Sequence, residues 1–322
     1  MKKALSRILS LLLLTALLSG CSDKADSGKD KIESPYCENA VRIVDALGYE
    51  HVIEEPPRRV AALIGSFAEV WQLAGGEVVA APEDAWDDLG LTLTGAVCIG
   101  GAHSPNAELL LSVSPDLVLA SSSTASNVEL RDTLTAAGAT VIYYDVDCFE
   151  DYLSMLRELT YITGRSDLYE KNGLALRDRI EDLKSDLAKS GISESERRIL
   201  LLRASSSSVK AKGSEGTVLG EMLSDMGCIN IADSNSGILE ELSAESIIAA
   251  DPYRIFVVTM GDDTEAAKRS LEALFSESES LGGLSAVKAG RVHVMDRHLY
   301  NMKPNARWAE AYGGLYEILT DV

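Results

Sequence analysis

The chain contains one helix–proline–strand unit twice, and this repeat constrains the fold more than any other feature of the sequence. Residues 105–120 contain a short predicted helix that stops at Pro115 and runs into an aliphatic strand. Residues 242–258 repeat the pattern around Pro252, and in both copies a glutamate (Glu108, Glu245) stands seven residues before the proline. Proline cannot continue a helix, and aliphatic runs suit strands covered on both faces. The repeat therefore predicts two similar lobes.

Aliphatic strands alternate with helical stretches on both sides of this repeat. Such alternation favours mostly parallel sheets with helices on their faces. We therefore predict an α/β fold of two Rossmann-like lobes, in which Ser66 caps the first helix of the first lobe. The predicted strands are 60–64, 77–81, 96–99, 117–120 and 140–144 in the first half, and 199–203, 229–232, 255–258 and 292–295 in the second.

The stretch 167–190 predicts a single long helix between the lobes, because its leucine and isoleucine residues recur with helical spacing. Gly173 lowers the helix propensity of this stretch, because glycine in a helix interior is unfavourable. No flexible linker flanks this helix, so we expect it to limit how far the lobes can open. The predicted organisation is a signal peptide at 1–20, a lipidated tether and first strand at 21–57, an N-terminal lobe at 58–164, a bridging helix at 165–190, and a C-terminal lobe with a closing helix at 191–322.

The N-terminus has the pattern of a bacterial export signal. Basic residues precede an apolar run at 8–18, which is too short to span a membrane but suits a signal peptide. The sequence Leu18-Ser19-Gly20-Cys21 then resembles the bacterial lipobox, whose cysteine is lipidated and becomes the first residue after cleavage. We expect a protein that is anchored through Cys21 on the extracytoplasmic face of the bacterial cell membrane.

Charge and cysteine spacing exclude several classes of function. The formal net charge of −20 argues against binding to nucleic acid and against electrostatic docking on anionic lipid. The remaining cysteines are widely spaced and match no metal motif. Outside the cytoplasm they could form disulfides or stay as buried thiols, and both remain open for Cys37, Cys98, Cys148 and Cys228.

No catalytic motif is present. The chain has no Gly-x-x-x-x-Gly-Lys loop, no His-Glu-x-x-His pair, and no nucleophile elbow around its serine-rich stretches. We therefore predict a binding protein without catalytic activity and without a cofactor of its own. The alternatives are a secreted hydrolase acting through Ser122 or His103, and a surface interaction protein that has lost its ligand.

The loops that follow the predicted strands form the candidate binding surface, since ligands of parallel sheets bind beyond the carboxyl ends of the strands. Several of these loops carry polar, aromatic or basic side chains. The candidate ligand-binding residues are Ser66, Trp86, His103, Ser122, Tyr144, Arg203, Lys212, Met260, Arg297, Tyr300 and Lys303.

From Arg58 onward the chain resembles the substrate-binding proteins of ABC importers for ferric siderophores, haem and cobalamin. The resemblance rests on the order of Arg59-Val60 before Gly65-Ser66, the stretch 106–118, Gly164 before the long helix, and the repeat at 242–252. It implies a ligand cleft between two lobes joined by one rigid helix, and a monomeric protein. It also implies that Glu108 and Glu245 dock onto arginines of a permease dimer, whose ATPase drives transport.

An iron–siderophore complex is the predicted ligand. Such chelates are often anionic, and the second lobe carries a basic group of residues in or near its loops: Arg203, Lys210, Lys212, Arg297, Lys303 and Arg307. Few aromatic residues lie in the loops, which disfavours the large flat ligands haem and cobalamin. His103 could ligate haem iron, and a bare metal ion would need convergent ligands such as His103, His298, Asp145 and Asp262. The sequence assigns no purpose to 303–308.

Overall fold

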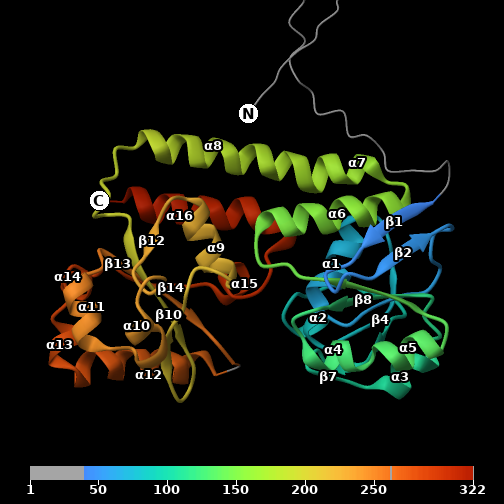
Figure 1. Cartoon of the computed structure of the whole chain (residues 1–322), viewed down its shortest axis with the longest axis horizontal. Helices are drawn as coiled ribbons and strands as arrows, with labels where there is room; N and C mark the ends of the chain where they lie inside the picture. Colours follow the sequence, from blue (N-terminus) through green and yellow to red (C-terminus); the bar gives the residue numbers. More distant parts are fainter. Residues whose placement is uncertain (1–39, 262, 322) are drawn as a thin grey trace, which may run out of the picture. The chain divides into compact units, whose positions relative to one another are not determined.

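The computed structural model describes residues 40–261 and 263–321 (Figure 1). Every described residue belongs to one compact unit of the chain. The predicted signal peptide, the lipidation site Cys21, and Cys37 lie outside the described residues. Among the residues that are described, no helix is long and apolar enough to cross a membrane. An antiparallel hairpin of β1 (Val41–Val44) and β2 (Glu50–Ile53) comes first.

Five parallel strands form the sheet of the first lobe, in the order β5-β4-β3-β8-β9. They are β3 (Val60–Ala62), β4 (Val78–Ala81), β5 (Val97–Cys98), β8 (Leu117–Ser121) and β9 (Thr140–Tyr144). A short hairpin of β6 (Gly100–Gly101) and β7 (Ser104–Pro105) follows β5. The helices of this lobe are α1 (Gly65–Leu73), α2 (Asp84–Asp87), α3 (Ala107–Ser112), α4 (Ala125–Glu129), α5 (Arg131–Ala136) and α6 (Phe149–Thr163).

Both faces of this sheet are buried. Successive side chains of a strand point to opposite faces, so Ala62 and Leu119 join the core that contains α1 and α6. Ala61 and Val118 pack on the other face with residues of α3 and α5. Every residue of β8 is buried, which explains why this strand is an aliphatic run without polar alternation.

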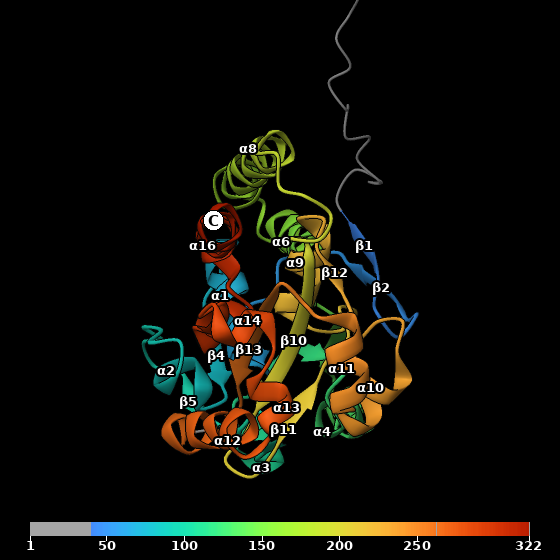
Figure 2. The ribbon, with the colours of Figure 1, turned by 90° about the vertical axis from the view of Figure 1, so that its left-hand side faces the viewer.

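The second lobe has a sheet in the order β11-β10-β13-β14, with β12 paired to the start of β10. All pairs are parallel except β10 with β11. Figure 2, which views this lobe, shows α10 and α11 beside β10. The strands are β10 (Arg198–Ala204), β11 (Val209–Ala211), β12 (Ile229–Asn230), β13 (Arg254–Thr259) and β14 (Val292–Met295). The helices are α9 (Val218–Asp225), α10 (Ser236–Glu241), α11 (Ala244–Ala250), α12 (Thr264–Glu277), α13 (Glu279–Gly282), α14 (Ser285–Lys288), α15 (Arg297–Tyr300) and α16 (Trp308–Thr320).

The two lobes repeat one topology. The strand order β4-β3-β8-β9 of the first lobe corresponds to β12-β10-β13-β14 of the second. The helix–proline–strand units occupy equivalent places, since α3 leads into β8 and α11 leads into β13. The sequence repeat therefore marks a structural repeat, and the predicted α/β fold of two lobes with mostly parallel sheets is confirmed.

One long helical stretch joins the lobes. Helix α7 (Ser166–Tyr169), a π-helical segment η1 (Glu170–Leu174) and α8 (Ala175–Lys189) follow one another without a break. Gly173 lies in η1, where a Cβ atom would come within 3.0 Å of the Leu153 side chain of α6. The glycine that weakens the helix in the sequence therefore permits a close approach between η1 and α6.

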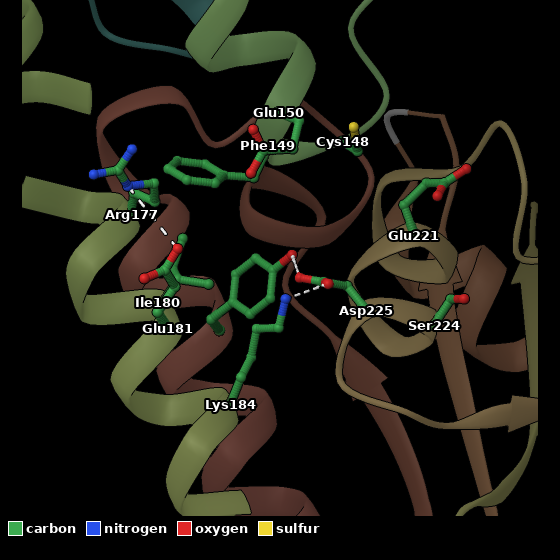
Figure 3. A pocket seen from close by; sticks show the side chains of 11 residues that line it. Cys148, Phe149, Glu150, Arg177, Ile180, Glu181, Lys184, Glu221, Ser224 and Asp225 are labelled. Atoms are coloured by element: carbon green, nitrogen blue, oxygen red, sulfur yellow. Dashed lines mark hydrogen bonds and ion pairs between the residues drawn. The ribbon is translucent and has the colours of Figure 1, made fainter. Parts of the chain in front are cut away.

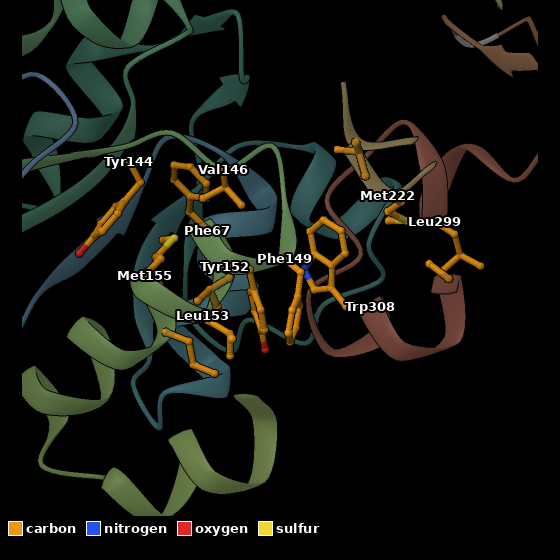
Figure 4. Close-up of a cluster of buried hydrophobic side chains, with 14 of the residues drawn as sticks. Phe67, Tyr144, Val146, Phe149, Tyr152, Leu153, Met155, Met222, Leu299 and Trp308 are labelled. Carbon is orange, nitrogen blue, oxygen red and sulfur yellow. The ribbon is translucent and has the colours of Figure 1, made fainter. Parts of the chain in front are cut away.

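A shared apolar core also connects the lobes. Trp308 of α16 packs edge-to-face on Phe149 of α6, with ring centroids 5.9 Å apart, and lies near Tyr152 of the same helix. Met222 of α9 and Leu299 of α15 belong to the same core (Figure 4). Because this core contains strands and helices of both lobes, their relative position depends on packing as well as on the bridging helix.

Local structure differs from the sequence predictions at several places. Ser66 lies inside α1, and the N-cap is Ile64, so the predicted cap is wrong. The Gly65 amide, at the first position of this helix, instead donates to Asp84 from α2, a partner that local sequence does not reveal. Between β8 and β9 the chain forms two short helices, α4 and α5, that meet at Leu130. Strand β11 and helices α10, α13, α14 and α15 are too short for periodicity to predict.

Candidate functional site

Loops at the carboxyl ends of the two sheets contact each other. Arg297, which follows β14 in the second lobe, forms an ion pair of 3.3 Å with Asp88, just after α2 in the first lobe. The Asn305 side-chain amide donates to the Ser66 carbonyl (2.9 Å) and to the Glu69 carboxylate (2.7 Å), both in α1. The edges where parallel sheets bind ligands therefore meet at the boundary between the lobes.

A cavity of about 290 Å³ lies at this boundary. Its lining mixes acidic and basic side chains from both lobes: Glu69, Asp88 and Leu89 from the first, and His298, Lys303, Pro304 and Arg307 from the second. Burial lowers the pKa of the Lys303 ammonium, an effect that the nearby carboxylate of Asp147 opposes. Of the predicted ligand residues, only Lys303 lines this cavity.

Three basic side chains gather at the hairpin of β10 and β11, and we call Arg203, Lys210 and Lys212 the cationic hairpin. Arg203 lies opposite Lys210 in the strand register. Lys212 is two residues beyond Lys210, so all three side chains belong to the same face. Burial lowers the pKa values of Arg203 and Lys212, and the positive charges of Arg203 and Lys210 lower that of Lys212 further.

The other basic residues of the predicted patch have carboxylate neighbours. Arg297 pairs with Asp88, and Arg307 donates two hydrogen bonds of 2.7 Å to Glu310. The Lys303 ammonium group interacts electrostatically with the nearby Asp147 carboxylate. The six predicted basic residues therefore fall into two sets. Arg297, Lys303 and Arg307 have carboxylate neighbours, and the other three form the cationic hairpin.

Two predicted aromatic ligand residues belong to the core instead. Tyr144 is 7% exposed, and its ring packs edge-to-face against Phe67. Tyr300 is 5% exposed and donates its hydroxyl hydrogen bond to the Ala311 carbonyl, while burial raises its pKa to about 12. Tyr144 is the last residue of β9 and Tyr300 is the last residue of α15, and both side chains belong to the core that the lobes share. Trp86 of α2 is half-buried against this core.

The remaining predicted ligand residues lie on separate loops. His103 is exposed in the turn between β6 and β7. The Ser122 amide donates to the Tyr144 carbonyl, which fixes the loop after β8. Met260 is 52% exposed after β13, and its amide donates to the Ala204 carbonyl at the end of β10. Within the described residues, no group of three or more His, Cys, Asp or Glu side chains could hold a metal ion.

The paired glutamates occupy equivalent positions in their helices. Glu108 and Glu245 each stand second in a helix, after an N-cap side chain that accepts from a backbone amide three residues on (Asn106 and Ser243). In each unit a non-glycine residue of positive φ lies between the helix and the proline, directly before the proline: φ is 44° at Ser114 and 39° at Asp251. Both glutamates are exposed, and neither forms an ion pair or side-chain hydrogen bond with another described residue.

Comparison with known proteins agrees with this architecture. The family model described as Periplasmic binding protein matches residues 60–299. The chain belongs to this family. A match over this range includes both sheets, both helix–proline–strand units and the bridging helix, so the resemblance found in the sequence is confirmed.

Individual proteins also resemble the chain over nearly its whole length. It is 26% identical to the Fe(3+)-citrate-binding protein YfmC of Bacillus subtilis, over 90% of this chain and 89% of YfmC. It is 24% identical to an uncharacterized ABC transporter substrate-binding lipoprotein of that organism, YvrC, over 93% and 92%. Among solved structures, Staphylococcus aureus SirA complexed with staphyloferrin B matches with a TM-score of 0.68 and 22% identity, over 86% of this chain and 98% of SirA.

A second cavity, of about 310 Å³, lies where the bridging helix of this periplasmic binding protein meets α6, α9 and α16 (Figure 3). Asp225 of α9 accepts hydrogen bonds from Lys184 of α8 and from the Tyr312 hydroxyl of α16. Cys148 also lines it and is a free thiol, as are Cys98 and Cys228. These contacts attach the bridging helix to the second lobe.

Three of the residues that hold the lobes together were absent from the sequence prediction. Asn305, Glu69 and Asp88 were not candidates, because each has a partner from the opposite lobe. The one local signal is Asn305 itself, since asparagine tolerates the left-handed conformation that it adopts here (φ 48°). The segment 303–308, which had no assigned purpose, joins the second lobe to α1 and to the shared core.

Glu69 should make stability depend on pH. Burial raises the pKa of its carboxyl group, so the folded state binds more protons than the unfolded state between the ordinary and the raised pKa. The free energy of unfolding should therefore fall as pH rises through that window. Glu69→Gln keeps an acceptor for Asn305 and should remove this fall, so the variant gains stability relative to wild type as pH rises from the ordinary carboxyl pKa through the raised pKa of Glu69.

Denaturant unfolding at several pH values measures this difference. Glu129→Gln, an exposed glutamate of α4, is the matched control and should give a curve parallel to wild type. A Glu69→Gln curve that is also parallel to wild type would show that the carboxyl group titrates normally.

Proposed function

We propose that this chain is the extracytoplasmic solute-binding subunit of an ABC importer for a ferric siderophore or a similar iron chelate. The main support for this proposal is that two exposed glutamates, Glu108 and Glu245, occupy equivalent positions in the two lobes. In this proposal the protein binds its solute between the lobes as a monomer and carries out no reaction. The lipid anchor is Cys21, whose lipobox-like context agrees with relatives named as lipoproteins.

The repeat gives the two carboxylates a shared role. A partner of two similar subunits presents the same surface twice, and two equivalent carboxylates can engage both copies. An exposed glutamate in the first turn of a helix can also serve only the helix dipole. The residue-by-residue match of cap, glutamate, left-handed residue and proline favours the docking role, with arginines of a permease dimer as partners.

Relatives support iron chelates as the ligand class. YfmC is named as an Fe(3+)-citrate-binding protein, and the SirA structure holds staphyloferrin B. The cationic hairpin in a chain of net charge −20 also favours an anionic solute. The scarcity of exposed aromatic rings in the predicted ligand loops gives no support to haem or cobalamin.

Removing the two docking charges should stop transport and leave solute binding intact. Glu108→Gln and Glu245→Gln should each lower iron uptake by about 10-fold, and the double variant by about 100-fold, since each loses one interfacial ion pair. Cells that carry the variants in place of the native gene are given radioactive iron as ferric citrate, and uptake is measured. Binding of ferric citrate to the purified variants should stay within about twofold of wild type.

One exposed glutamate from each lobe provides a matched control. Glu129→Gln in α4 and Glu272→Gln in α12 remove the same charge away from the docking helices. Their uptake should equal that of wild type. Normal uptake by the Glu108→Gln, Glu245→Gln double variant would refute the docking role.

A further inference from the structure

We propose that the cationic hairpin recognises free carboxylates of the chelate, and that the ligand is a ferric complex of the α-hydroxycarboxylate class. This inference rests on the proposed function and narrows its ligand to one chemistry. It assigns recognition of charge to Arg203, Lys210 and Lys212 of the second lobe.

The strand pairing holds the three basic side chains together. The register of β10 and β11 places Arg203 across from Lys210, with Lys212 next on the same face. The Lys212 backbone amide donates to the Leu201 carbonyl, and this hydrogen bond fixes the backbone position of Lys212. Three like charges this close repel one another, so the arrangement costs free energy unless an anion binds there.

The described residues leave this charge without a neutralising partner. Across residues 40–261 and 263–321, no carboxylate forms an ion pair with Arg203, Lys210 or Lys212. The Arg203 Nε atom is buried and has no hydrogen-bond acceptor. A buried donor without an acceptor costs free energy, and a ligand oxygen at that position would recover it.

The cationic hairpin lies on the face of the second sheet that is turned toward the first lobe. Arg203 shares its face of β10 with Ile199 and Leu201, because alternate residues of a strand lie on one face. Those two residues belong to the core that both lobes share, whereas Leu200 and Leu202 belong to a core of the second lobe alone. Arg203 stands near the carboxyl end of β10, where ligands of parallel sheets bind.

The chemistry of the hairpin distinguishes among iron chelates. The planar arginine fork matches a carboxylate with two parallel hydrogen bonds. A hydroxamate complex, in which three monoanionic groups neutralise Fe³⁺, gains little from three cations. A ferric tris-catecholate is also anionic, but its catecholate oxygens bind iron and none belongs to a free carboxylate. A porphyrin needs aromatic faces to stack on, but the Tyr144 and Tyr300 rings lie in the core. A chelate with excess carboxylates, as in ferric citrate, uses the charges and needs no aromatic surface.

Equilibrium binding to a panel of chelates tests the inference. The full chain, purified in detergent, is titrated with ferric citrate, a ferric tris-catecholate, ferrioxamine B and haemin, and binding is followed by tryptophan fluorescence and calorimetry. Ferric citrate should bind at least about 10-fold more tightly than the other three. Its affinity should also fall as salt is raised, because salt screens the cationic hairpin.

Charge-removing variants connect this preference to the hairpin. Arg203→Gln and Lys212→Gln should each weaken ferric citrate binding by roughly 10- to 100-fold, since each loses a charge-assisted hydrogen bond. Arg269→Gln, an exposed residue of α12, is the matched control and should change the affinity by less than about twofold. Thermal unfolding checks that each variant is folded. Lys212 stands just beyond β11 and is less enclosed than Arg203, so its variant serves if Arg203→Gln does not fold.

The outcomes separate this inference from the proposed function. Tighter binding of the tris-catecholate, ferrioxamine B or haemin would overturn the carboxylate assignment and leave an iron-chelate receptor. Unchanged ferric citrate affinity in folded Arg203→Gln and Lys212→Gln would overturn the role of the hairpin. Failure of the wild-type chain to bind any member of the panel would contradict the proposed function as well.

Discussion

Trp308→Ala should lower the free energy of unfolding by about 3–5 kcal/mol, the largest effect that we expect from a single substitution. The Trp308 side chain is fully buried where α16 of the second lobe meets α6 of the first. Its ring contacts those of Phe149, Tyr152 and Tyr312. Removing it leaves a cavity between the lobes, and close-packed neighbours cannot fill such a space completely.

Guanidinium unfolding monitored by far-UV circular dichroism measures this loss. Trp308→Phe should cost less, because it keeps an aromatic ring and also removes an indole N–H that is buried without an acceptor. Trp86→Ala, at a half-buried tryptophan of the first lobe, is the control and should also cost less. A loss below about 1 kcal/mol for Trp308→Ala would show that the two lobes do not depend on this contact.

Asn305→Ala should cost about 2–4 kcal/mol, the second large effect. Its side-chain amide is fully buried and donates to the Ser66 carbonyl and the Glu69 carboxylate of the first lobe. Alanine leaves both acceptors without this donor. It also disfavours the positive φ that residue 305 adopts, which asparagine tolerates better.

Asn305→Gly separates these two causes. Glycine accepts the positive φ but supplies no amide, so the loss that remains in this variant reports the hydrogen bonds alone. Both variants are compared with wild type by denaturant unfolding, and the ferric citrate affinity is measured alongside, since the contact fixes α1 against the second lobe. Stability equal to wild type in both variants would contradict a linking role for Asn305.

Asn305 and Trp308 show what the segment 303–308 does: it connects the second lobe to the first. The last strand, β14, ends the second sheet, yet the chain then returns to the first lobe before α16 begins. The segment 303–308 is thus one of several connections between the lobes. The others are the Arg297–Asp88 ion pair, the shared core and the bridging helix. We therefore expect solute binding to produce only small changes in the angle between the lobes, which scattering measurements with and without ferric citrate can test.

Much of the fold was predictable because its signals are local. A helix that stops at proline before an aliphatic strand is visible within a stretch of 16 residues, and the chain shows it twice. The long helix between the lobes was likewise visible in the spacing of its leucines. The candidate site was harder to predict, since the sequence shows which loops follow strands but not which side chains turn toward the ligand.

The basic residues illustrate this limit. In the sequence, Arg203 and Arg297 are equivalent candidates. In the structure, Arg297 pairs with Asp88, more than 200 positions earlier in the chain, whereas Arg203 has no carboxylate partner among the residues that the structure describes. Tyr300 was expected to contact the ligand, but its hydroxyl bonds to α16.

The sequence alone determined the α/β class, the doubled unit and the two equivalent glutamates, because helix caps, prolines and strand periodicity act over a few residues. Only the tertiary structure decided which charges are neutralised, which aromatic rings enter the core, and how the last segment fastens the lobes together. Those outcomes depend on partners brought together by packing, and Asn305 with Ser66 is the clearest case, since the two residues are 239 positions apart.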